Sequence, residues 1–122
     1  MPKPKRVAAQ NEAALKRAVV AALQLELRGR GKVLRLNAGK LVLSDAKYGR
    51  RVLSGVEPGT PDLLVLLPGG RCVWIELKAE RGRVTELQAS WHANARALGH
   101  HVAVCRTVQD AIATVLLVLE AA

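Results

Sequence analysis

The stretch GTPDLLVLLPGGRCVWIELK, residues 59–78, decides the fold because it holds two short apolar runs separated by turn-forming residues. Residues 63–67 and 72–77 are rich in leucine and β-branched side chains, and residues 68–70, Pro-Gly-Gly, lie between them. This pattern predicts a β-hairpin with a three-residue loop. Strands as apolar as these are typical of a sheet that is buried on both faces.

Three charged residues interrupt this apolar hairpin. With a three-residue loop, Leu67 pairs with Arg71. Counting back along both strands then places Asp62 opposite Glu76, and a longer loop would shift this register by about one residue. Lys78 lies two residues after Glu76, so both side chains leave the strand on the same face. We therefore expect two carboxylates and one ammonium group to converge.

A close pair of carboxylates repels itself unless a proton or a cation lies between the two groups. Mg²⁺ or Mn²⁺ suits two hard oxygen ligands whose coordination is completed by water. Lys78 beside such an ion could orient or deprotonate an attacking water. The alternative is that Glu76 and Lys78 form an exposed cross-strand pair and that Asp62 is only a turn residue. Buried charges must be paired or bind metal, so the apolar strands favour the metal site.

The motif G-T-P-D at residues 59–62, followed by E-L-K at residues 76–78 and by Gln88 in the next expected helix, resembles the PD-(D/E)xK nuclease superfamily. Within it, the chain is similar to the VRR-NUC (virus-type replication-repair nuclease) domain in its stand-alone phage and bacterial form. The resemblance runs from about residue 10 to the C-terminus. It implies an α/β restriction-endonuclease-like fold with a mixed central sheet flanked by helices.

The resemblance also implies a set of metal ligands. Asp62 and Glu76 would be the metal-binding carboxylates, and the backbone carbonyl of Leu77 would be a further ligand. Glu12 matches the glutamate that begins the family's first helix and reaches the metal directly or through water. The alternative for Glu12 is that an acid in a first helical turn simply complements the helix dipole.

Two further roles follow from the same resemblance. Lys78 would act on the attacking water, and Gln88 would support both this lysine and the phosphate from the next helix. Without the resemblance, Gln88 would be read as a surface glutamine beside the apolar stripe of its helix. The implied reaction is in-line attack of water on phosphorus, which leaves 5′-phosphate products.

The resemblance implies a Mg²⁺- or Mn²⁺-dependent DNA endonuclease that is selective for Holliday junctions or other branched DNA and acts in DNA repair. Stand-alone members of the family imply a homodimer. One alternative is a restriction-type or nicking nuclease that acts on duplex DNA. A second alternative is a non-catalytic nucleic-acid-binding module on a nuclease scaffold, and a third is a basic structural protein.

Composition agrees with a nucleic-acid partner. The 122 residues suffice for one domain, and 19 basic against 10 acidic residues give a net charge of +9, which attracts polyanions. Such a charge also suits solubility or RNA binding, but two of the acids fall in the most apolar segment. With two Trp, one Tyr and no Phe, base stacking has little support, and we expect contact with the DNA backbone.

Two basic segments are candidates for this contact. Residues 1–9 are expected to form a flexible basic tail that precedes a single nuclease domain over residues 10–122. Residues 44–57 are expected to form a polar loop that either grips DNA or is simply solvated. The candidate DNA-binding residues in the two segments are Lys3, Lys5, Arg6, Lys47, Arg50 and Arg51.

The remaining segments complete the expected sandwich of helices on a sheet of about five strands. Apolar spacing predicts a first helix over residues 10–28 and a second that begins near Thr85 and places Trp91 in the core. Residues 108–121 are expected to form a terminal helix so apolar that it packs in a core or against a second copy. The other expected strands are residues 32–36, 41–43 and 101–106.

Cysteine usage and hydropathy indicate the compartment. Cys72 and Cys105 lack the spacing of a zinc site, and we interpret them as core residues of a protein in a reducing environment. No apolar run reaches the ~18 residues that cross a bilayer, and no secretory signal is expected. We therefore expect the cytoplasm of a bacterial or phage-infected cell.

Overall fold

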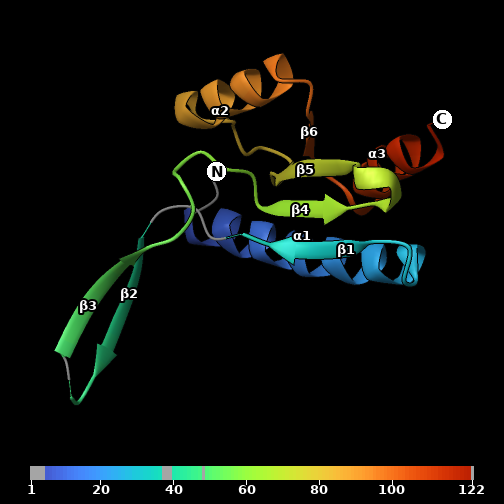
Figure 1. Cartoon of the computed structure of the whole chain (residues 1–122). Coiled ribbons are helices and arrows are strands. Elements are labelled where there is room, and N and C mark those ends of the chain that lie inside the picture. Colours follow the sequence, from blue (N-terminus) through green and yellow to red (C-terminus); the bar gives the residue numbers. More distant parts are fainter. Residues whose placement is uncertain (1–4, 37–39, 48, 122) are drawn as a thin grey trace.

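A computed structural model describes residues 5–36, 40–47 and 49–121, in which α-helices flank a central sheet and a separate two-stranded sheet is present. Figure 1 shows their arrangement. The elements are α1 (Lys5–Leu27), β1 (Lys32–Arg35), β2 (Lys40–Asp45), β3 (Gly49–Ser54), β4 (Leu63–Leu66), the 3₁₀ turn η1 (Pro68–Gly70), β5 (Cys72–Leu77), α2 (Glu86–Ala97), β6 (His101–Cys105) and α3 (Val108–Glu120).

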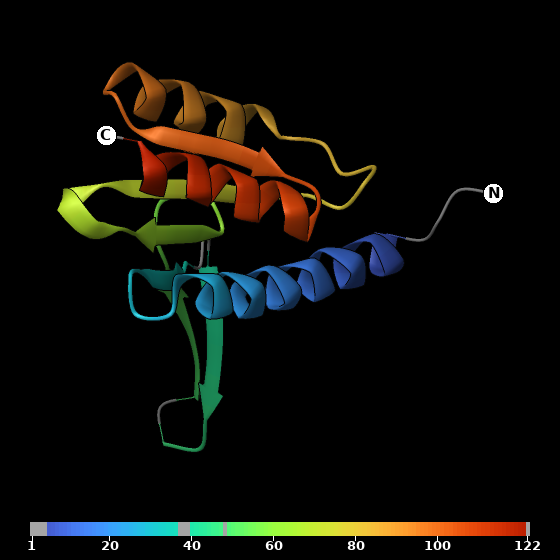
Figure 2. The same ribbon diagram turned by 90° about the vertical axis from the view of Figure 1, so that its right-hand side faces the viewer.

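The central sheet has four strands in the order β1-β4-β5-β6. The pairs β1–β4 and β4–β5 are antiparallel, and β5 and β6 are parallel, so the sheet is mixed as expected. Helices α1 and α3 cover one face of this sheet, and α2 covers the other (Figures 1 and 2). The structure therefore has the predicted α/β class, a mixed central sheet flanked by helices.

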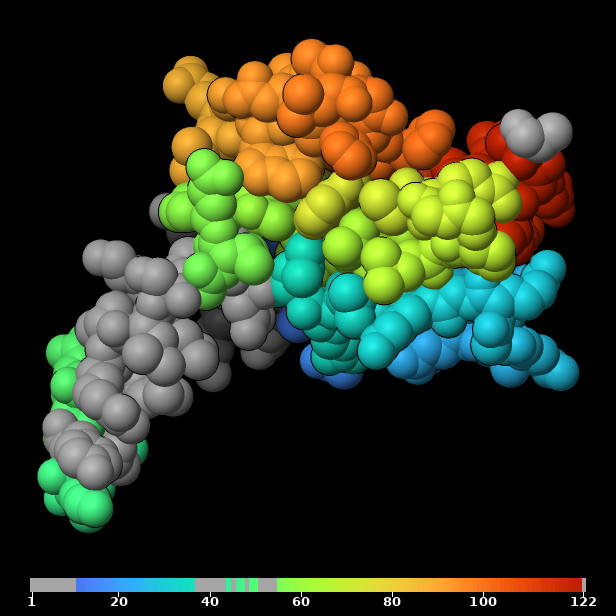
Figure 3. Space-filling view, in the orientation of Figure 1, coloured from blue at the N-terminus to red at the C-terminus, as the bar shows by residue number. Residues whose placement is uncertain are grey.

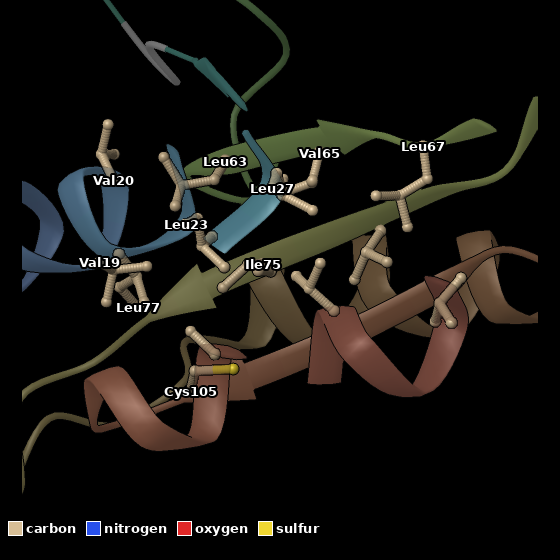
Figure 4. Packing of buried hydrophobic residues seen from close by; sticks show 14 residues of the cluster. Val19, Val20, Leu23, Leu27, Leu63, Val65, Leu67, Ile75, Leu77 and Cys105 are labelled. Carbon is tan, nitrogen blue, oxygen red and sulfur yellow. The ribbon is translucent and has the colours of Figure 1, made fainter. Parts of the chain in front are cut away.

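The hydrophobic core lies between the sheet and the helices α1 and α3. On α1, Val19, Leu23 and Leu27 recur every four residues and are at most 1% exposed, which confirms the apolar stripe of the first helix. Alternate residues of β5 also point into this core, and Figure 4 shows Ile75 and Leu77 among them. Burial on the scale of such leucine side chains stabilises the fold by roughly 1.5–3 kcal/mol each.

The N-terminal end of the domain differs from the expectation. Helix α1 begins at Lys5, so residues 5–9 of the expected tail belong to a helix, while residues 1–4 lie outside the described residues. A proline just before the first turn is compatible with this early start, because the first N–H groups of a helix have no intrahelical partner anyway. At the other end, Thr107 caps α3 by accepting a hydrogen bond from the Asp110 N–H, 3.0 Å away.

The prediction of a polar loop over residues 44–57 was wrong. Strand β3 falls within it and pairs with β2 from Lys40↔Ser54 to Asp45↔Gly49, so the two form a separate antiparallel hairpin. This hairpin arm, residues 40–54, projects from the body of the domain (Figures 1 and 2). It also explains why the central sheet has four strands and not five, because β2 pairs with β3 and not with the sheet.

The turn between β4 and β5 is tied to the end of α3. The Arg71 guanidinium donates hydrogen bonds to the carbonyls of Val118, at 2.6 Å, and Leu119, at 3.0 Å, and also to the Ala121 carbonyl. A cation at a helix C-terminus satisfies carbonyls that have no partner within the helix.

In the described ranges, no helix is both long and apolar enough to span a membrane.

Candidate active site

The charged residues of the hairpin meet where β4 begins and β5 ends. The Leu67 N–H donates to the Arg71 carbonyl at 2.8 Å, and Leu63 pairs with Ile75, which is the register expected for a three-residue loop. One step further along both strands, Asp62 lies opposite Glu76. The convergence predicted from the spacing is confirmed.

Glu76 is the most enclosed of these groups, with only 3% of its surface exposed. Its Oε1 lies 3.8 Å from the Lys78 Nζ and accepts a hydrogen bond from the Gln88 Nε2 at 3.2 Å. Its Oε2 is buried and accepts no hydrogen bond from an N–H or hydroxyl group of the described residues. A buried carboxylate oxygen without a donor is unfavourable when charged, so this position favours a proton or a cation beside Glu76.

Asp62 is held from two sides. Its Oδ2 accepts a hydrogen bond from the backbone N–H of Leu77 at 2.8 Å, which fixes the carboxylate across the two strands. Its Oδ1 lies 3.2 Å from the Lys16 Nζ on α1. Sequence reasoning missed Lys16, although it lies four residues after Glu12 and therefore shares a helix face with it. That spacing was the available signal.

Glu12 reaches the site from the first half of α1. Together with Lys16, Asp62 and Leu77 it lines a cavity of about 190 Å³. An ideal Cβ added to Gly82 would lie 2.8 Å from the Glu12 Oε1, so the loop after β5 approaches this side chain closely because Gly82 has none. Because α1 begins at Lys5, Glu12 does not lie in the first turn, so the alternative that it complements the helix dipole there does not apply.

Gln88 is fixed by the start of α2. The Thr85 hydroxyl accepts from the Gln88 N–H at 3.2 Å, and the Gln88 Oε1 accepts from the Thr85 N–H at 3.0 Å. These two bonds form a capping box. The expectation that Thr85 caps this helix is confirmed, and Gln88 is not a plain surface residue, since its remaining amide N–H points to Glu76.

The motif that precedes Asp62 depends on a glycine. Gly59 has a φ of +95°, and an added Cβ would lie 2.8 Å from the Leu87 carbonyl oxygen of α2. Only a residue without a side chain allows this close approach together with this backbone conformation. Gly59 therefore sets both the path into Asp62 and the distance between this loop and the helix that carries Gln88.

Burial and crowding change the acidity of Glu76. Its pKa is raised from 4.5 to about 8, chiefly because burial disfavours the charged form. The negative charge of Asp62 and a hydrogen bond with its carboxylate raise it further, and Glu12 adds a smaller effect, while Lys78 acts in the opposite direction. The pair therefore holds a proton near neutral pH, as two facing carboxylates without a cation should.

Comparison with known proteins agrees with this constellation. A family model described as the VRR-NUC domain matches residues 9–109. The chain belongs to the VRR-NUC family. "Putative nuclease p44" of Acyrthosiphon pisum secondary endosymbiont phage 1 is 40% identical over 67 residues, which cover 52% of this chain and 72% of the phage protein.

The fold of this VRR-NUC domain also has a solved counterpart. A structure described as a VRR_NUC domain matches with a TM-score of 0.56 over 87% of this chain and 95% of the other chain. The two sequences are 21% identical, so the likeness concerns the fold. Family and fold together make the chain a nuclease domain.

The predicted DNA-binding residues of the VRR-NUC domain do not lie in one place. Lys47 and Arg50 are exposed on the hairpin arm, and Arg51 belongs to strand β3 of the same arm. The backbone of Lys5 and Arg6 lies in the first turn of α1, and Lys3 lies outside the described residues. These positions are separate from the carboxylate site in the sequence and come from different elements.

The second helix differs from the expectation in its apolar stripe. Trp91 was expected in the core but is half-buried and lines an open groove between α2 and β5. Leu87 and Leu98 of the same stripe are 58% and 79% exposed. His92, which was given no structural role, is instead 2% exposed, and burial lowers its pKa.

Replacement of Glu76 by glutamine should remove a pH dependence of stability. Without divalent metal, between about pH 4.5 and about pH 8, the folded chain holds a proton on Glu76 that the unfolded chain releases. The free energy of unfolding therefore falls as pH rises through this range. In Glu76→Gln that fall disappears. We expect the variant's Tm in EDTA to exceed that of the wild type by several degrees at pH 8 and to approach it near pH 4.5.

The control is Glu80→Gln, which changes an exposed glutamate of the loop after β5. It should follow the wild-type pH profile. If Glu76→Gln follows that profile as well, Glu76 does not titrate as described.

Gly59→Ala should destabilise the domain by more than ~1 kcal/mol, because alanine is strained at a positive φ and its Cβ would meet the Leu87 carbonyl. Urea denaturation measures the change in free energy. Gly29→Ala is a matched control, since Gly29 also has a positive φ, +84°, but open space around it. Equal losses in the two variants would contradict the close approach of the loop to α2.

Proposed function

We propose that this chain is a metal-dependent DNA endonuclease whose active site is built on Asp62, Glu76 and Lys78. The observation that carries the proposal is the buried Glu76 carboxyl group beside a second carboxylate, with no N–H or hydroxyl donor at its Oε2. Asp62 and Glu76 would hold a divalent cation, whose charge would take the place of the shared proton. Two carboxylates, with a third from Glu12 across the neighbouring cavity, suit Mg²⁺ or Mn²⁺ better than softer metals.

The ligands would come from three elements. Asp62 and Glu76 supply carboxylates, the Leu77 backbone supplies a carbonyl at the same strand end, and Glu12 supplies a carboxylate across the cavity, directly or through water. Among the residues described, no three His, Cys, Asp or Glu side chains are preassembled around one point. Water and phosphate oxygens would therefore complete the coordination. When bound, the ion would supply charge neutralisation at the phosphate and acidify the attacking water.

The chain's own groups perform the remaining tasks. Gln88 holds one oxygen of Glu76 and so leaves the other free for a ligand. Lys78, 8% exposed, has its ammonium on the same side as this carboxylate, where it can orient the attacking water and receive or hold a proton. Lys16 balances the charge of Asp62 and is a position from which an ammonium can also meet a phosphate oxygen.

DNA binding would use the basic surface as a whole. The net charge of +9 draws a polyanion to the domain, and the hairpin arm carries Lys47, Arg50 and Arg51 away from the body. Such an arm can follow a phosphate backbone or a groove. Lys3, Lys5 and Arg6 of the N-terminal segment would add contacts with phosphates.

The substrate we propose is branched DNA such as a Holliday junction, cut by a homodimer that brings one active site to each of two strands. The terminal helix supports the dimer, since Leu117 on α3 is 74% exposed and an apolar helix favours a partner surface. The setting would be DNA repair in the cytoplasm of a bacterial or phage-infected cell, and the phage origin of the relative fits that setting.

Loss of the proposed catalytic groups should abolish cleavage but not binding. We expect Asp62→Ala, Glu76→Ala and Lys78→Ala each to lower the cleavage rate by at least ~100-fold, because each removes a metal ligand or a proton-handling group. Circular dichroism and DNA affinity in Ca²⁺ should stay close to wild type. Glu12→Ala and Gln88→Ala should lower the rate less, and Arg17→Ala, an exposed change on α1, should leave it unaltered.

If Asp62→Ala cleaves normally, the catalytic assignment is wrong. If DNA binds tightly and nothing is cut with any divalent metal, the chain is a binding module on a nuclease scaffold. Isothermal titration of Mn²⁺ into wild type and Glu76→Gln gives a readout apart from activity, since the wild type should bind the ion and the variant should lose most of that binding.

Substrate preference is tested with a labelled four-way junction beside a linear duplex of the same sequences, in Mg²⁺, Mn²⁺ or EDTA. We expect metal-dependent cutting of the junction at least ~10-fold faster than cutting of the duplex, because only a branched substrate would engage both sites of a dimer. Equal rates on the two substrates would favour the restriction-type or nicking alternative. Sedimentation at the same protein concentration determines whether the active species is a dimer.

A further inference from the structure

A second hollow lies beside the proposed catalytic site, on the face of the sheet that α2 covers. This Trp groove has a volume of about 340 Å³ and is lined by β5, α2 and the loop before β4. In Figure 3 that loop, drawn in green, lies against α2, drawn in orange. The residues that line the groove are Glu57, Pro58, Trp74, Leu87, Ser90, Trp91, Asn94, Ala95, Leu98 and His100.

The walls of the Trp groove are aromatic. Trp74 of β5 and Trp91 of α2 are in edge-to-face contact, with ring centroids 5.0 Å apart and an interplanar angle of 62°. The sequence contains two tryptophans, so both of them line this hollow. Leu87 and Leu98 also line the groove and are 58% and 79% exposed. Large apolar side chains on the apolar stripe of a helix are usually buried.

One polar atom in this aromatic wall lacks a partner. The Trp74 Nε1 is buried and has no hydrogen-bond acceptor among the described residues. A buried indole N–H normally finds an acceptor, and leaving it unpaired costs free energy. The groove therefore suits a flat ligand that brings acceptor atoms at its edge, and a purely aliphatic side chain would leave this donor unsatisfied.

The Trp groove is connected to the catalytic site through two elements. Trp74 precedes Glu76 by two residues on β5, so both side chains are on the same face of the sheet and about 7 Å apart along the strand. On α2, Leu87 and Trp91 flank Gln88, which donates to Glu76. A DNA strand whose phosphate lies at the carboxylates thus has a neighbouring base within reach of the groove.

We propose that the Trp groove binds one unpaired nucleobase next to the phosphate that is cut. This inference rests on the proposed nuclease function and adds the local structure of its substrate, which is an unstacked nucleotide. Every base offers a π-face for Trp91 and ring or carbonyl acceptors for an indole N–H. Ser90 and Asn94 supply further polar groups along the helix edge of the groove.

The two tryptophans make the groove directly observable. In EDTA, where no cutting occurs, a short oligothymidylate should quench the intrinsic fluorescence of the wild type. An oligonucleotide of equal length made of abasic nucleotides has the same phosphates without bases and should bind without this quenching. Equal quenching by both, or none by oligothymidylate that binds, would overturn the proposal. A fluorescence change that depends only on protein concentration would assign the groove to a second copy and would overturn it as well.

Variants of Trp91 separate stacking from folding. Trp91→Ala should weaken binding of the oligothymidylate by about 5- to 150-fold, the range for loss of one base-stacking side chain. Trp91→Phe keeps an aromatic face and should lose only a few-fold. Leu25→Ala, an exposed change on α1, is the matched control and should bind like the wild type. If Trp91→Ala fails to fold, the comparison of oligothymidylate with abasic DNA still decides the matter.

Cleavage distinguishes failure of this inference from failure of the nuclease proposal. On a branched substrate with an abasic nucleotide beside the cut, the wild type should cut at least ~5-fold more slowly than on the intact substrate, whereas Trp91→Ala should cut both at one rate. Cutting that ignores the missing base in the wild type would overturn the base pocket alone. Base-dependent quenching without cutting in any metal would overturn the nuclease function and leave the pocket in place.

Discussion

The carboxylate pair of Asp62 and Glu76 is the constraint on which the rest of the structure depends. Two acids meet at the end of strands that are otherwise apolar. Their mutual repulsion must therefore be offset by groups on the surrounding elements. The repulsion is offset by a proton on Glu76, by an ammonium group beside each carboxylate and by an amide from α2. A bound cation would also offset this repulsion. A carboxylate pair that is unfavourable in isolation therefore indicates a functional site.

The position of the pair in the sheet gives it precision. Strand β5 is paired on both sides, antiparallel to β4 and parallel to β6, and its alternate side chains are buried in the core. The groups that surround the pair come instead from helices, with Glu12 and Lys16 on α1 and Gln88 on α2. The carboxylates are thus held by the most constrained part of the fold, and the helices adjust the charges around them.

Local rules predicted those parts of the site that depend on local geometry. The register that places Asp62 opposite Glu76 follows from a three-residue turn, and the cap at Thr85 follows from the residue types there. Lys16 was missed, because its contact with Asp62 depends on how α1 crosses the sheet. Trp91 shows a similar limit, since the apolar stripe of α2 was recognised but its angle to the sheet is a tertiary property. Strand β3 of the hairpin arm was missed because Arg50 and Arg51 give its sequence the polar character of a loop.

The amide of Gln88 has a consequence for which residues can occupy this position. Its oxygen accepts from the Thr85 N–H, and its nitrogen donates to Glu76. Glutamate would satisfy the helix cap equally well but has no N–H to offer the carboxylate and would add a further negative charge. Asparagine has the right groups on a shorter stem. One side chain thus couples the architecture of a helix start to the chemistry of the strand end, so drift in one is restrained by selection on the other.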